Sequence, residues 1–263
     1  MPPHKELRAK KLGPCVIDLF AGVGGLSLGA ARAGFNLALA VELDKHAMAA
    51  HKRNFPNAGH LAADIRTLDG EKLLQHVGIL QGELDGLIGG PPCQGFSVIG
   101  HRRVTDPRNN LFHKFFALVA ECRPRFFVAE NVLGILDDQY AEIRNEALGL
   151  VSSDYVLLDA MRLKASDFGA ATSRERAFFV GYRPGMVAPL SKADFDAQKV
   201  SKSSTVADAL HGLPKRIFSK WLTEQQGWRK VLPMPQNDFA QRIIDCIPQD
   251  VGDPEAIRRH REE

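Results

Sequence analysis

The sequence predicts an α/β protein built on a doubly wound, mostly parallel sheet, and two observations support this. Short apolar segments and segments with helical spacing alternate through the first two thirds of the 263-residue chain, a pattern typical of parallel strands joined by crossover helices. A glycine-rich turn, residues 18–25, begins at the end of the first apolar segment, where such folds connect the first strand to the first helix. After Arg183, prolines recur and apolar periodicity fades, which predicts an irregular C-terminal extension.

The expected elements follow from local patterns. The short apolar segments predict strands at residues 16–20, 37–41, 84–88, 125–129, 155–158 and 177–181. Helical spacing predicts helices at residues 25–32, 45–53, 111–121 and 142–150. Gly34 is a natural end for the first of these helices. Residues 206–210 form a short amphipathic island in the C-terminal extension.

Composition limits the classes of protein that need considering. Hydrophobic residues make up 44% and charged residues 25% of the chain, as in ordinary soluble proteins. Apolar runs are too short for a membrane span, and no signal-peptide core is visible. The four cysteines, Cys15, Cys93, Cys122 and Cys246, lack metal-ligand spacing, so we expect no metal site and a reducing, cytoplasmic compartment. The net charge of +3 is compatible with a polyanionic partner.

One cysteine stands in a special turn. Residues 89–97 read Gly-Gly-Pro-Pro-Cys-Gln-Gly-Phe-Ser and directly follow an apolar segment. The prolines must end the strand and stiffen the backbone before Cys93. A thiol at the carboxyl end of a parallel strand lies where open α/β sheets bind ligands. We expect a nucleophile; the alternative is a buried structural cysteine.

Acidic residues follow successive strand ends. Asp18 and Phe20 lie in the glycine-rich turn, and they suit a ligand with an ammonium group and an adenine ring better than a pyrophosphate. Glu42 follows about 20 residues later, where an acid accepts hydrogen bonds from ribose hydroxyls. Asp64 and Ile65 come next and are candidates to contact an adenine ring. Taken singly, each acid is better explained by solvation or helix capping than by ligand binding; their order along successive strand ends carries the inference.

Two further groups of charged residues lie between positions 130 and 176. Glu130 follows a buried strand that we expect beside the Cys93 turn. Arg174 and Arg176 open the last strand and share one face, because side chains alternate along a strand. The alternative for this pair is a salt-bridged, exposed strand edge.

Together these residues resemble the DNA (cytosine-5) methyltransferase family. The set comprises residues 18–25, Glu42, Asp64, the Pro-Pro-Cys-Gln run, residues 110–112, residues 130–132 and Arg174-x-Arg176, in family order over roughly the first two thirds of the chain. The resemblance implies a Rossmann-like methyltransferase fold. It also implies methyl transfer from S-adenosylmethionine to carbon 5 of cytosine in DNA, with S-adenosylhomocysteine as product, within a restriction–modification system.

The resemblance implies roles for individual residues. Cys93 attacks carbon 6 of a flipped cytosine, Glu130 contacts ring nitrogen 3 and the exocyclic amine, and Arg176, next to Arg174, holds the carbonyl oxygen. The implied cofactor-binding residues are Asp18, Phe20, Ala21, Gly22, Gly24, Gly25, Leu26, Glu42, Leu43, Asp64, Ile65, Gly90, Pro91 and Leu111. The implied DNA-binding residues, in a mobile loop at 94–109, are Gln94, Ser97, Arg102, Arg103 and Arg108.

The chain departs from the family pattern in two places. Thr172 stands where the family has Gln before Arg-x-Arg. The Arg/Glu-rich motif and the Gly-Asn-x-Val motif that follow the family's target-recognition region are not found. We therefore expect a catalytic, cofactor-binding domain at 1–184 and an incomplete start of a recognition domain at 185–263. These departures suggest one subunit of a split enzyme whose second protein chain supplies the missing parts, or else a truncated chain.

Other functions stay open at this point. A tRNA cytosine-5 methyltransferase would use the same residues, and a non-catalytic subunit that binds cofactor or DNA would retain part of them. A dehydrogenase is a weaker alternative, because the glycine-rich turn permits it but the Cys93 turn does not support it. A DNA methyltransferase is expected to be associated with the nucleoid. The target sequence is not readable from these residues.

Overall fold

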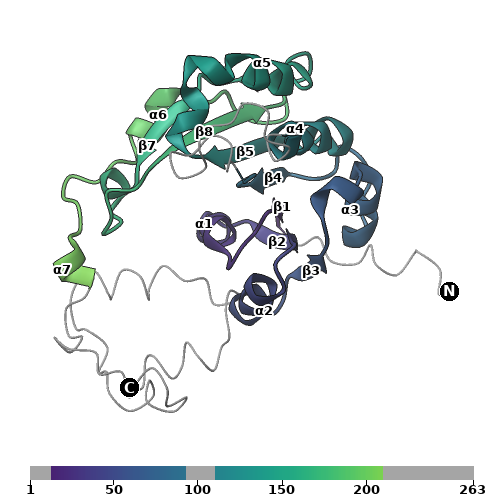
Figure 1. Cartoon of the computed structure of the whole chain (residues 1–263), viewed down its shortest axis with the longest axis horizontal. Helices are drawn as coiled ribbons and strands as arrows, with labels where there is room; N and C mark the ends of the chain where they lie inside the picture. The colour runs from purple at the N-terminus through teal and green to yellow at the C-terminus, as the bar shows by residue number, and fades with distance from the viewer. Residues whose placement is uncertain (1–12, 93–109, 210–263) are drawn as a thin grey trace, which may run out of the picture.

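The computed structural model describes residues 13–92 and 110–209, which form one eight-stranded sheet flanked by helices (Figure 1). The strand order is β3-β2-β1-β4-β5-β8-β6, with β7 paired to β8. This order starts at β1 and winds outward in both directions. The α/β fold expected from the sequence is therefore confirmed.

Five strands form the parallel half of the sheet: β1 (Cys15–Leu19), β2 (Asn36–Glu42), β3 (Gly59–Ala62), β4 (Gly86–Gly89) and β5 (Phe126–Asn131). In this register Gly89 of β4 lies between Leu19 of β1 and Ala129 of β5. The residues that follow these three positions consequently emerge side by side at one edge of the sheet. β4 ends at Gly89, with one residue between it and the two prolines, which cannot continue the sheet ladder.

The other strands are antiparallel to their neighbours. β8 (Glu175–Tyr182) runs antiparallel to β5, and β6 (Val156–Leu157) and β7 (Met161–Lys164) run antiparallel to β8. The start of β8 therefore meets the end of β5, with Glu130 opposite Phe178. Strand β7 was not expected from the sequence. Glu130 and Asn131, which were expected just after a strand, are the last two residues of β5.

Helices cover both faces of the sheet. α1 (Gly25–Arg32) and α2 (Lys45–Asn54) lie on one face, and α3 (Gly70–Val77), α4 (Asn110–Cys122) and α5 (Ala141–Gly149) lie on the other (Figure 1). The apolar face of α4 lies in the core, since Phe112, Phe115 and Phe116 are fully buried. Phe116 packs edge-on against Phe127 of β5 at 5.4 Å between ring centroids.

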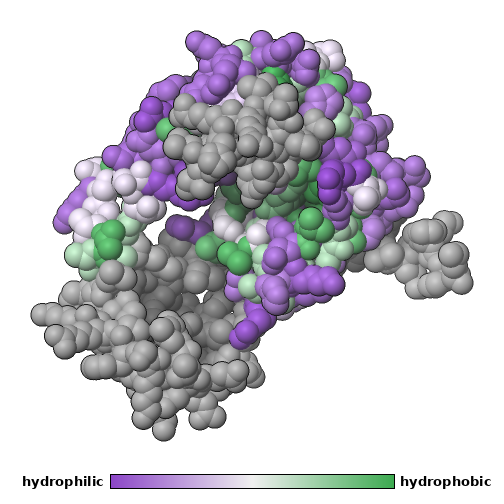
Figure 2. Space-filling model, viewed as in Figure 1, coloured by the Kyte–Doolittle hydropathy of each residue, from purple (hydrophilic) through white to green (hydrophobic). Residues whose placement is uncertain are grey.

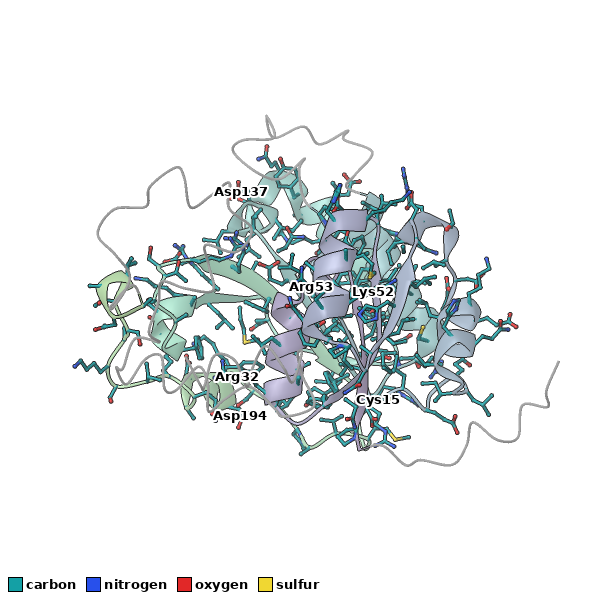
Figure 3. The ribbon with its side chains drawn as sticks, turned by 90° about the horizontal axis from the view of Figure 1, so that it is seen from below. Cys15, Arg32, Lys52, Arg53, Asp137 and Asp194 are labelled. Atoms are coloured by element: carbon teal, nitrogen blue, oxygen red, sulfur yellow. The ribbon has the colours of Figure 1, made fainter. Side chains whose placement is uncertain are left out.

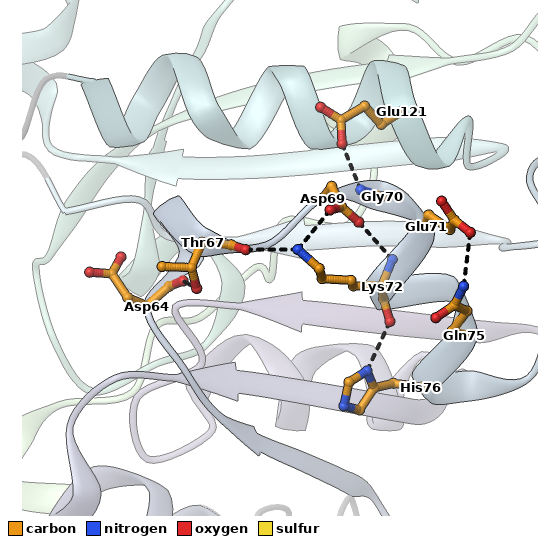
Figure 4. Close-up of polar contacts among 9 residues, drawn as sticks. All are labelled: Asp64, Thr67, Asp69, Gly70, Glu71, Lys72, Gln75, His76 and Glu121. Carbon is orange, nitrogen blue, oxygen red and sulfur yellow. Dashed lines mark hydrogen bonds and ion pairs between the residues drawn. The ribbon is translucent and has the colours of Figure 1, made fainter.

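The sequence prediction missed β3 and α3. Helix α3 has a clear start, because the Asp69 carboxylate caps it by accepting a hydrogen bond from the Lys72 N–H at 2.8 Å. Glu121 of α4 then accepts a hydrogen bond from the Gly70 N–H at 2.6 Å (Figure 4). A Cβ atom on Gly70 would lie 2.6 Å from the Glu121 Cβ. The Glu121 contact and this close approach fix helices α3 and α4 against each other.

Short elements complete the described residues. They are the 3-10 helices η1 (Ile65–Thr67), η3 (Leu133–Leu136), η4 (Asp138–Tyr140) and η5 (Ala165–Phe168), and the helices α6 (Lys192–Asp196) and α7 (Val206–Ala209). The segment after β8 returns to the sheet edge, where the Val200 N–H donates to the Asp167 carbonyl at 2.8 Å. No helix within residues 13–92 and 110–209 is long and apolar enough to cross a membrane.

Candidate active site

A cleft of about 1290 Å³ opens at the edge of the sheet where β1, β4 and β5 end. Residues of α1 line it on one side, and residues of β7, η5 and α6 line it on the other. Figure 2 shows mostly hydrophilic residues on the outer surface of the molecule and hydrophobic residues gathered around a hollow near the centre of the face shown. The predicted residues that line the cleft are Asp18, Phe20, Ala21, Gly25, Leu26, Gly90, Glu130, Arg174 and Arg176.

The glycine-rich turn wraps tightly around the end of β1. Phe20 and Gly22 have φ values of 60° and 57°, and Gly24 has a φ of 107°. The Ala21 N–H donates to the Val41 carbonyl at 3.1 Å, which holds the turn against β2. A Cβ atom on Gly24 would lie 2.1 Å from the Phe55 ring, so only glycine fits there.

Asp18 is the most unusual acid of the cleft. Its side chain is fully buried, and Oδ2 accepts a hydrogen bond from the Ser27 hydroxyl at 2.5 Å. Its second oxygen, Oδ1, is buried and has no hydrogen-bond partner among the described residues. Burial raises the pKa of Asp18 to about 7, although the hydrogen bonds with Ser27 act in the opposite direction. Because its pKa is close to neutral pH, the protonation state of Asp18 depends on the charge that is present in the cleft.

Glu42 is held at the end of β2 by two backbone donors. Its Oε2 accepts from the Gly22 N–H at 2.8 Å, and its Oε1 accepts from the Asp44 N–H at 2.8 Å. These bonds orient the carboxylate toward the glycine-rich turn and leave lone pairs on both oxygens. Leu43, next to it, exposes 62% of its surface. Neither Glu42 nor Leu43 is among the residues that line the cleft, and their contact with a cofactor stays a prediction.

Asp64 and Ile65 do not line the cleft. Asp64 caps η1 through the Arg66 N–H at 2.9 Å and forms an ion pair with the Arg66 guanidinium group at 2.5 Å. These contacts lower the pKa of Asp64. Ile65 is buried in the core. The structure therefore shows the capping alternative for Asp64, and its contact with an adenine ring stays a prediction. The remaining predicted cofactor-binding residues outside the cleft lining are Gly22, Gly24, Pro91 and Leu111.

Glu130 and the two arginines form the polar end of the cleft. Arg176 Nε lies 3.0 Å from Glu130 Oε1, and an Arg174 guanidinium nitrogen lies 3.9 Å from the same oxygen. Glu175 points to the other face of β8 and pairs with Arg162 of β7. The two arginines therefore share one face, and they surround an internal carboxylate rather than form an independent salt-bridged edge.

The turn that leads to Cys93 is anchored beside Glu130. Asn131 is buried and donates from Nδ2 to the Pro91 carbonyl at 3.3 Å, while its Oδ1 accepts from the Val132 N–H at 2.9 Å. A Cβ atom on Gly90 would lie 3.2 Å from Glu130 Oε2. The backbone before the thiol thus runs directly alongside the Glu130 carboxylate.

Several predicted residues lie outside the described residues. They are Cys93 and the proposed DNA contacts Gln94, Ser97, Arg102, Arg103 and Arg108. The sequence analysis missed other residues that line the cleft: Gly29, Arg32, Ala33, Leu163, Lys164, Ala165, Phe168, Phe178, Phe195 and Gln198. Arg32 closes α1 at the rim (Figure 3). Leu163 and Lys164 belong to β7, whose short sequence gave no strand signal, and Phe178 belongs to β8, which was expected as a strand without a role for this residue.

The chain matches the family model for C-5 cytosine-specific DNA methylase over residues 15–254. It is 38% identical over 203 residues to the Type II methyltransferase M.XorII of Xanthomonas oryzae, covering 76% of this chain and 46% of that protein. It is 33% identical over 219 residues to M.AquIA of a Picosynechococcus species, covering 76% of this chain and 88% of that protein. The chain thus spans about half the length of most first-ranked relatives, and most of M.AquIA.

Solved structures of methyltransferases superpose on this chain. A DNA modification methyltransferase encoded within an E. coli prophage superposes with a TM-score of 0.83 at 43% identity, covering 95% of this chain and 69% of that one. The Dnmt2 methyltransferase of S. pombe, at 18% identity and a TM-score of 0.59, shares the fold. The family match over most of the chain, together with this structural likeness, shows that the chain belongs to the C-5 cytosine-specific DNA methylase family.

Proposed function

We propose that this protein transfers a methyl group from S-adenosylmethionine to carbon 5 of cytosine in DNA through a covalent Cys93 intermediate. The observation that carries the proposal is the Glu130–Arg176 pair, which lies at the end of β5 against the backbone that leads to Cys93. A carboxylate and a guanidinium group held together at 3.0 Å offer an acceptor and a donor to one planar ring. A pyrimidine presents complementary groups on adjacent ring positions.

The groups around the glycine-rich turn suit the cofactor in three ways. Asp18 contributes a buried carboxyl oxygen without a described partner, and Glu42 a carboxylate oriented by two backbone N–H groups. Phe20 lines the same cleft with an aromatic side chain. Asp18 would face the charged part of S-adenosylmethionine, Glu42 the ribose hydroxyls and Phe20 the adenine. When bound, the cofactor supplies an electrophilic methyl group.

The reaction on the base follows from the chain's own groups. The Cys93 thiolate adds to carbon 6, which makes carbon 5 nucleophilic, and the covalent adduct divides one difficult step into easier ones. Glu130 holds the proton at ring nitrogen 3 and accepts from the exocyclic amine, while Arg176 donates to the carbonyl oxygen. After methyl transfer, the carbon 5 proton leaves and Cys93 is eliminated. The base must leave the duplex to reach these groups.

We also propose that DNA target recognition requires a second protein chain. Relatives such as M.XorII are about twice as long as the region that matches, whereas the match covers 88% of M.AquIA. The expected recognition and cofactor-completing motifs were not found in residues 185–263. A chain of this kind would engage DNA with Gln94, Ser97 and the arginines of residues 102–108, and the proposed activity would place it at the nucleoid.

A transfer assay tests the proposal directly. Tritiated S-adenosylmethionine is incubated with the protein, alone and with the product of the neighbouring gene, on unmethylated duplex DNA and on tRNA. We expect label in DNA, a covalent complex with DNA that contains 5-fluorocytosine, and neither result with Cys93→Ala. Label in tRNA alone would replace the DNA substrate, and cofactor binding without label in any mixture would indicate a non-catalytic subunit. Full activity of the lone chain at one DNA sequence would contradict the need for a partner.

A further inference from the structure

A continuous chain of polar side chains leads away from the cleft through the interior of the protein. The Asp18 Oδ2 atom on β1 accepts from the Ser27 hydroxyl on α1 at 2.5 Å. Ser27 Oγ lies 3.0 Å from His51 Nε2 on α2, and His51 Nδ1 lies 3.0 Å from His60 Nε2 on β3. Four side chains from four different elements therefore form one hydrogen-bonded row.

The row is buried except at its far end. Asp18, Ser27 and His51 are completely buried, whereas His60 is partly exposed. Polar groups in a core lower stability unless they are paired, so a row of three is costly to retain as mere packing. Asp18, at one end of the row, lines the cleft, whereas His60, at the other end, is partly exposed and interacts with the charge of Lys52 on α2.

Each member of the row can both donate and accept, so the row has two complete proton arrangements. With Asp18 ionised, Ser27 donates to Asp18, His51 donates to Ser27, and His60 donates to His51. With Asp18 protonated, every bond reverses: Asp18 donates to Ser27, Ser27 to His51, and His51 to His60. If His60 is neutral in both arrangements, the second arrangement holds one more proton than the first. This proton enters or leaves at His60 Nδ1, the ring nitrogen that does not face His51.

The charges around the row make the equilibrium between its two proton arrangements depend on what is bound in the cleft. Burial raises the pKa of Asp18 to about 7, and Glu42 on β2 raises it further by repulsion. Burial lowers the pKa values of both histidines, and Lys52 lowers that of His60. Across the cleft stand Glu130 of β5 and the arginines at 174 and 176. A cation placed among these groups favours the ionised form of Asp18.

We propose that Ser27, His51 and His60 are positioning residues that pass a proton between Asp18 and the surface, so that Asp18 ionises when a positively charged ligand enters the cleft. This inference rests on the proposed function in one respect, namely that the ligand is S-adenosylmethionine. That cofactor carries one positive charge more than S-adenosylhomocysteine, the product left after methyl transfer. The row therefore adjusts the preference of the cleft for cofactor over product.

The experiment measures the dissociation constants of S-adenosylmethionine and S-adenosylhomocysteine by calorimetry between pH 5.5 and 8.5. For the wild-type protein, we expect the preference for S-adenosylmethionine to rise roughly tenfold across this range, with a midpoint near the pH at which Asp18 ionises. In Asp18→Asn the preference should not depend on pH. In Ser27→Ala the midpoint should move upward by about one pH unit, because Asp18 loses its hydrogen-bond donor. In His51→Phe it should move upward by roughly half as much, because His51 no longer polarises the Ser27 hydroxyl.

A second measurement needs no ligand. The ¹³C chemical shift of the Asp18 carboxyl carbon, followed by NMR in the free protein, reports its ionisation directly and should show the same shifts in the same variants. His76→Gln is the matched control, since His76 lies on the surface of α3 and bonds to the Lys72 carbonyl (Figure 4). It should leave both midpoints unchanged.

The outcomes separate the two proposals. If neither ligand binds the wild-type protein, the proposed function fails, and the NMR titration still decides whether the row controls Asp18. If both ligands bind but their ratio is independent of pH, or if the Asp18 midpoint is the same in Ser27→Ala as in the wild type, the inference about the row is wrong. If the Asp18 midpoint is unchanged only in His51→Phe, the histidines take no part in controlling the ionisation of Asp18.

Discussion

Arg176 Nε lies 3.0 Å from Glu130 Oε1, although the two residues stand on neighbouring antiparallel strands and are separated by more than 40 positions. Both side chains are mostly buried, with 22% and 23% of their surface exposed. The contact exists because β8 starts at the edge of the sheet where β5 ends. It brings the carboxylate, the guanidinium group and the turn before Cys93 to one place.

Glu130→Gln should reduce kcat by at least about 100-fold while changing cofactor affinity little, because the amide cannot hold a proton at ring nitrogen 3. Single-turnover methylation and calorimetry with S-adenosylmethionine measure the two effects separately. Arg162→Gln is the matched control, because Arg162 pairs with Glu175 on the opposite face of β8. Normal turnover in Glu130→Gln, or an equal loss in the control, would contradict the role of Glu130.

Asn131→Ala should affect catalysis through the backbone rather than through the base. The substitution leaves the Pro91 carbonyl and the Val132 N–H without their side-chain partner. We expect the free energy of unfolding to fall by about 1–3 kcal/mol. We expect kcat to fall as well, because the turn before Cys93 loses its anchor, while cofactor affinity stays near normal. Urea denaturation and single-turnover rates test this; a loss of stability with unchanged kcat would show that the anchor is only structural.

Much of this site was predictable because parallel strands place their ends together. The glycine-rich turn, Glu42, the Cys93 turn and Glu130 lie at the carboxyl ends of β1, β2, β4 and β5, and the apolar segments of these strands are clear in the sequence. The direction of β8 was not predictable, because an isolated strand carries no sign of its orientation. The contact between Glu130 and Arg176 therefore had to come from the structure.

Several other features could not be recognised in the sequence, each for a reason that lies in its own residues or contacts. β3 has four residues, all partly or fully exposed, so its sequence lacks the apolar run that identified the other strands. β7 alternates apolar and basic residues over only four positions. For Asp64 the sequence left ligand binding and capping open, and the structure shows the cap together with an ion pair to Arg66 two positions later. Ser27 and His51 looked like ordinary helix residues, because only the folded arrangement shows that they meet Asp18.

Cys122 should be chemically inert in the folded protein. It is completely buried in the core, and burial raises its pKa to about 12, so at pH 8 about one ten-thousandth of this thiol is ionised. Burial also raises the pKa of Cys15. During alkylation with iodoacetamide, peptide mapping should find both unmodified while the loss of methylation activity follows modification of Cys93. Adding urea should expose all thiols, and modification of Cys122 at the rate of a free thiol in the native protein would contradict its assignment to the core.

Gly24→Ala should destabilise the turn strongly. The substituted residue would have to keep a φ of 107°, and its Cβ would lie 2.1 Å from the Phe55 ring. We expect the free energy of unfolding to fall by about 2 kcal/mol or more, together with cofactor affinity. Gly149→Ala is the control, because Gly149 lies in α5 with no atom within 4 Å of the added carbon. Equal stability changes in the two variants, measured by urea denaturation, would contradict the steric argument.

The buried row also predicts how stability depends on pH. In the folded protein the pKa of Asp18 is raised from 3.8 to about 7, so folding favours its protonated form. The stabilisation from Asp18 is full below pH 3.8 and is lost as the pH rises to about 7, on the order of 4 kcal/mol in total. The pKa of His51 is lowered from 6.5 to about 4, so its contribution is full above pH 6.5 and is lost as the pH falls to about 4, roughly 3 kcal/mol.

These two contributions have opposite slopes and largely cancel in the wild-type protein, so removing either group should reveal the other. In Asp18→Asn, the free energy of unfolding should fall as the pH is lowered from 6.5 to 4.5, because His51 must then be protonated on unfolding. In His51→Phe it should rise over the same interval, because Asp18 retains its proton preferentially in the folded state. Urea denaturation at half-unit pH steps measures both slopes, with His76→Gln as the reference. Parallel curves for all three variants would mean that the buried row does not titrate in this range.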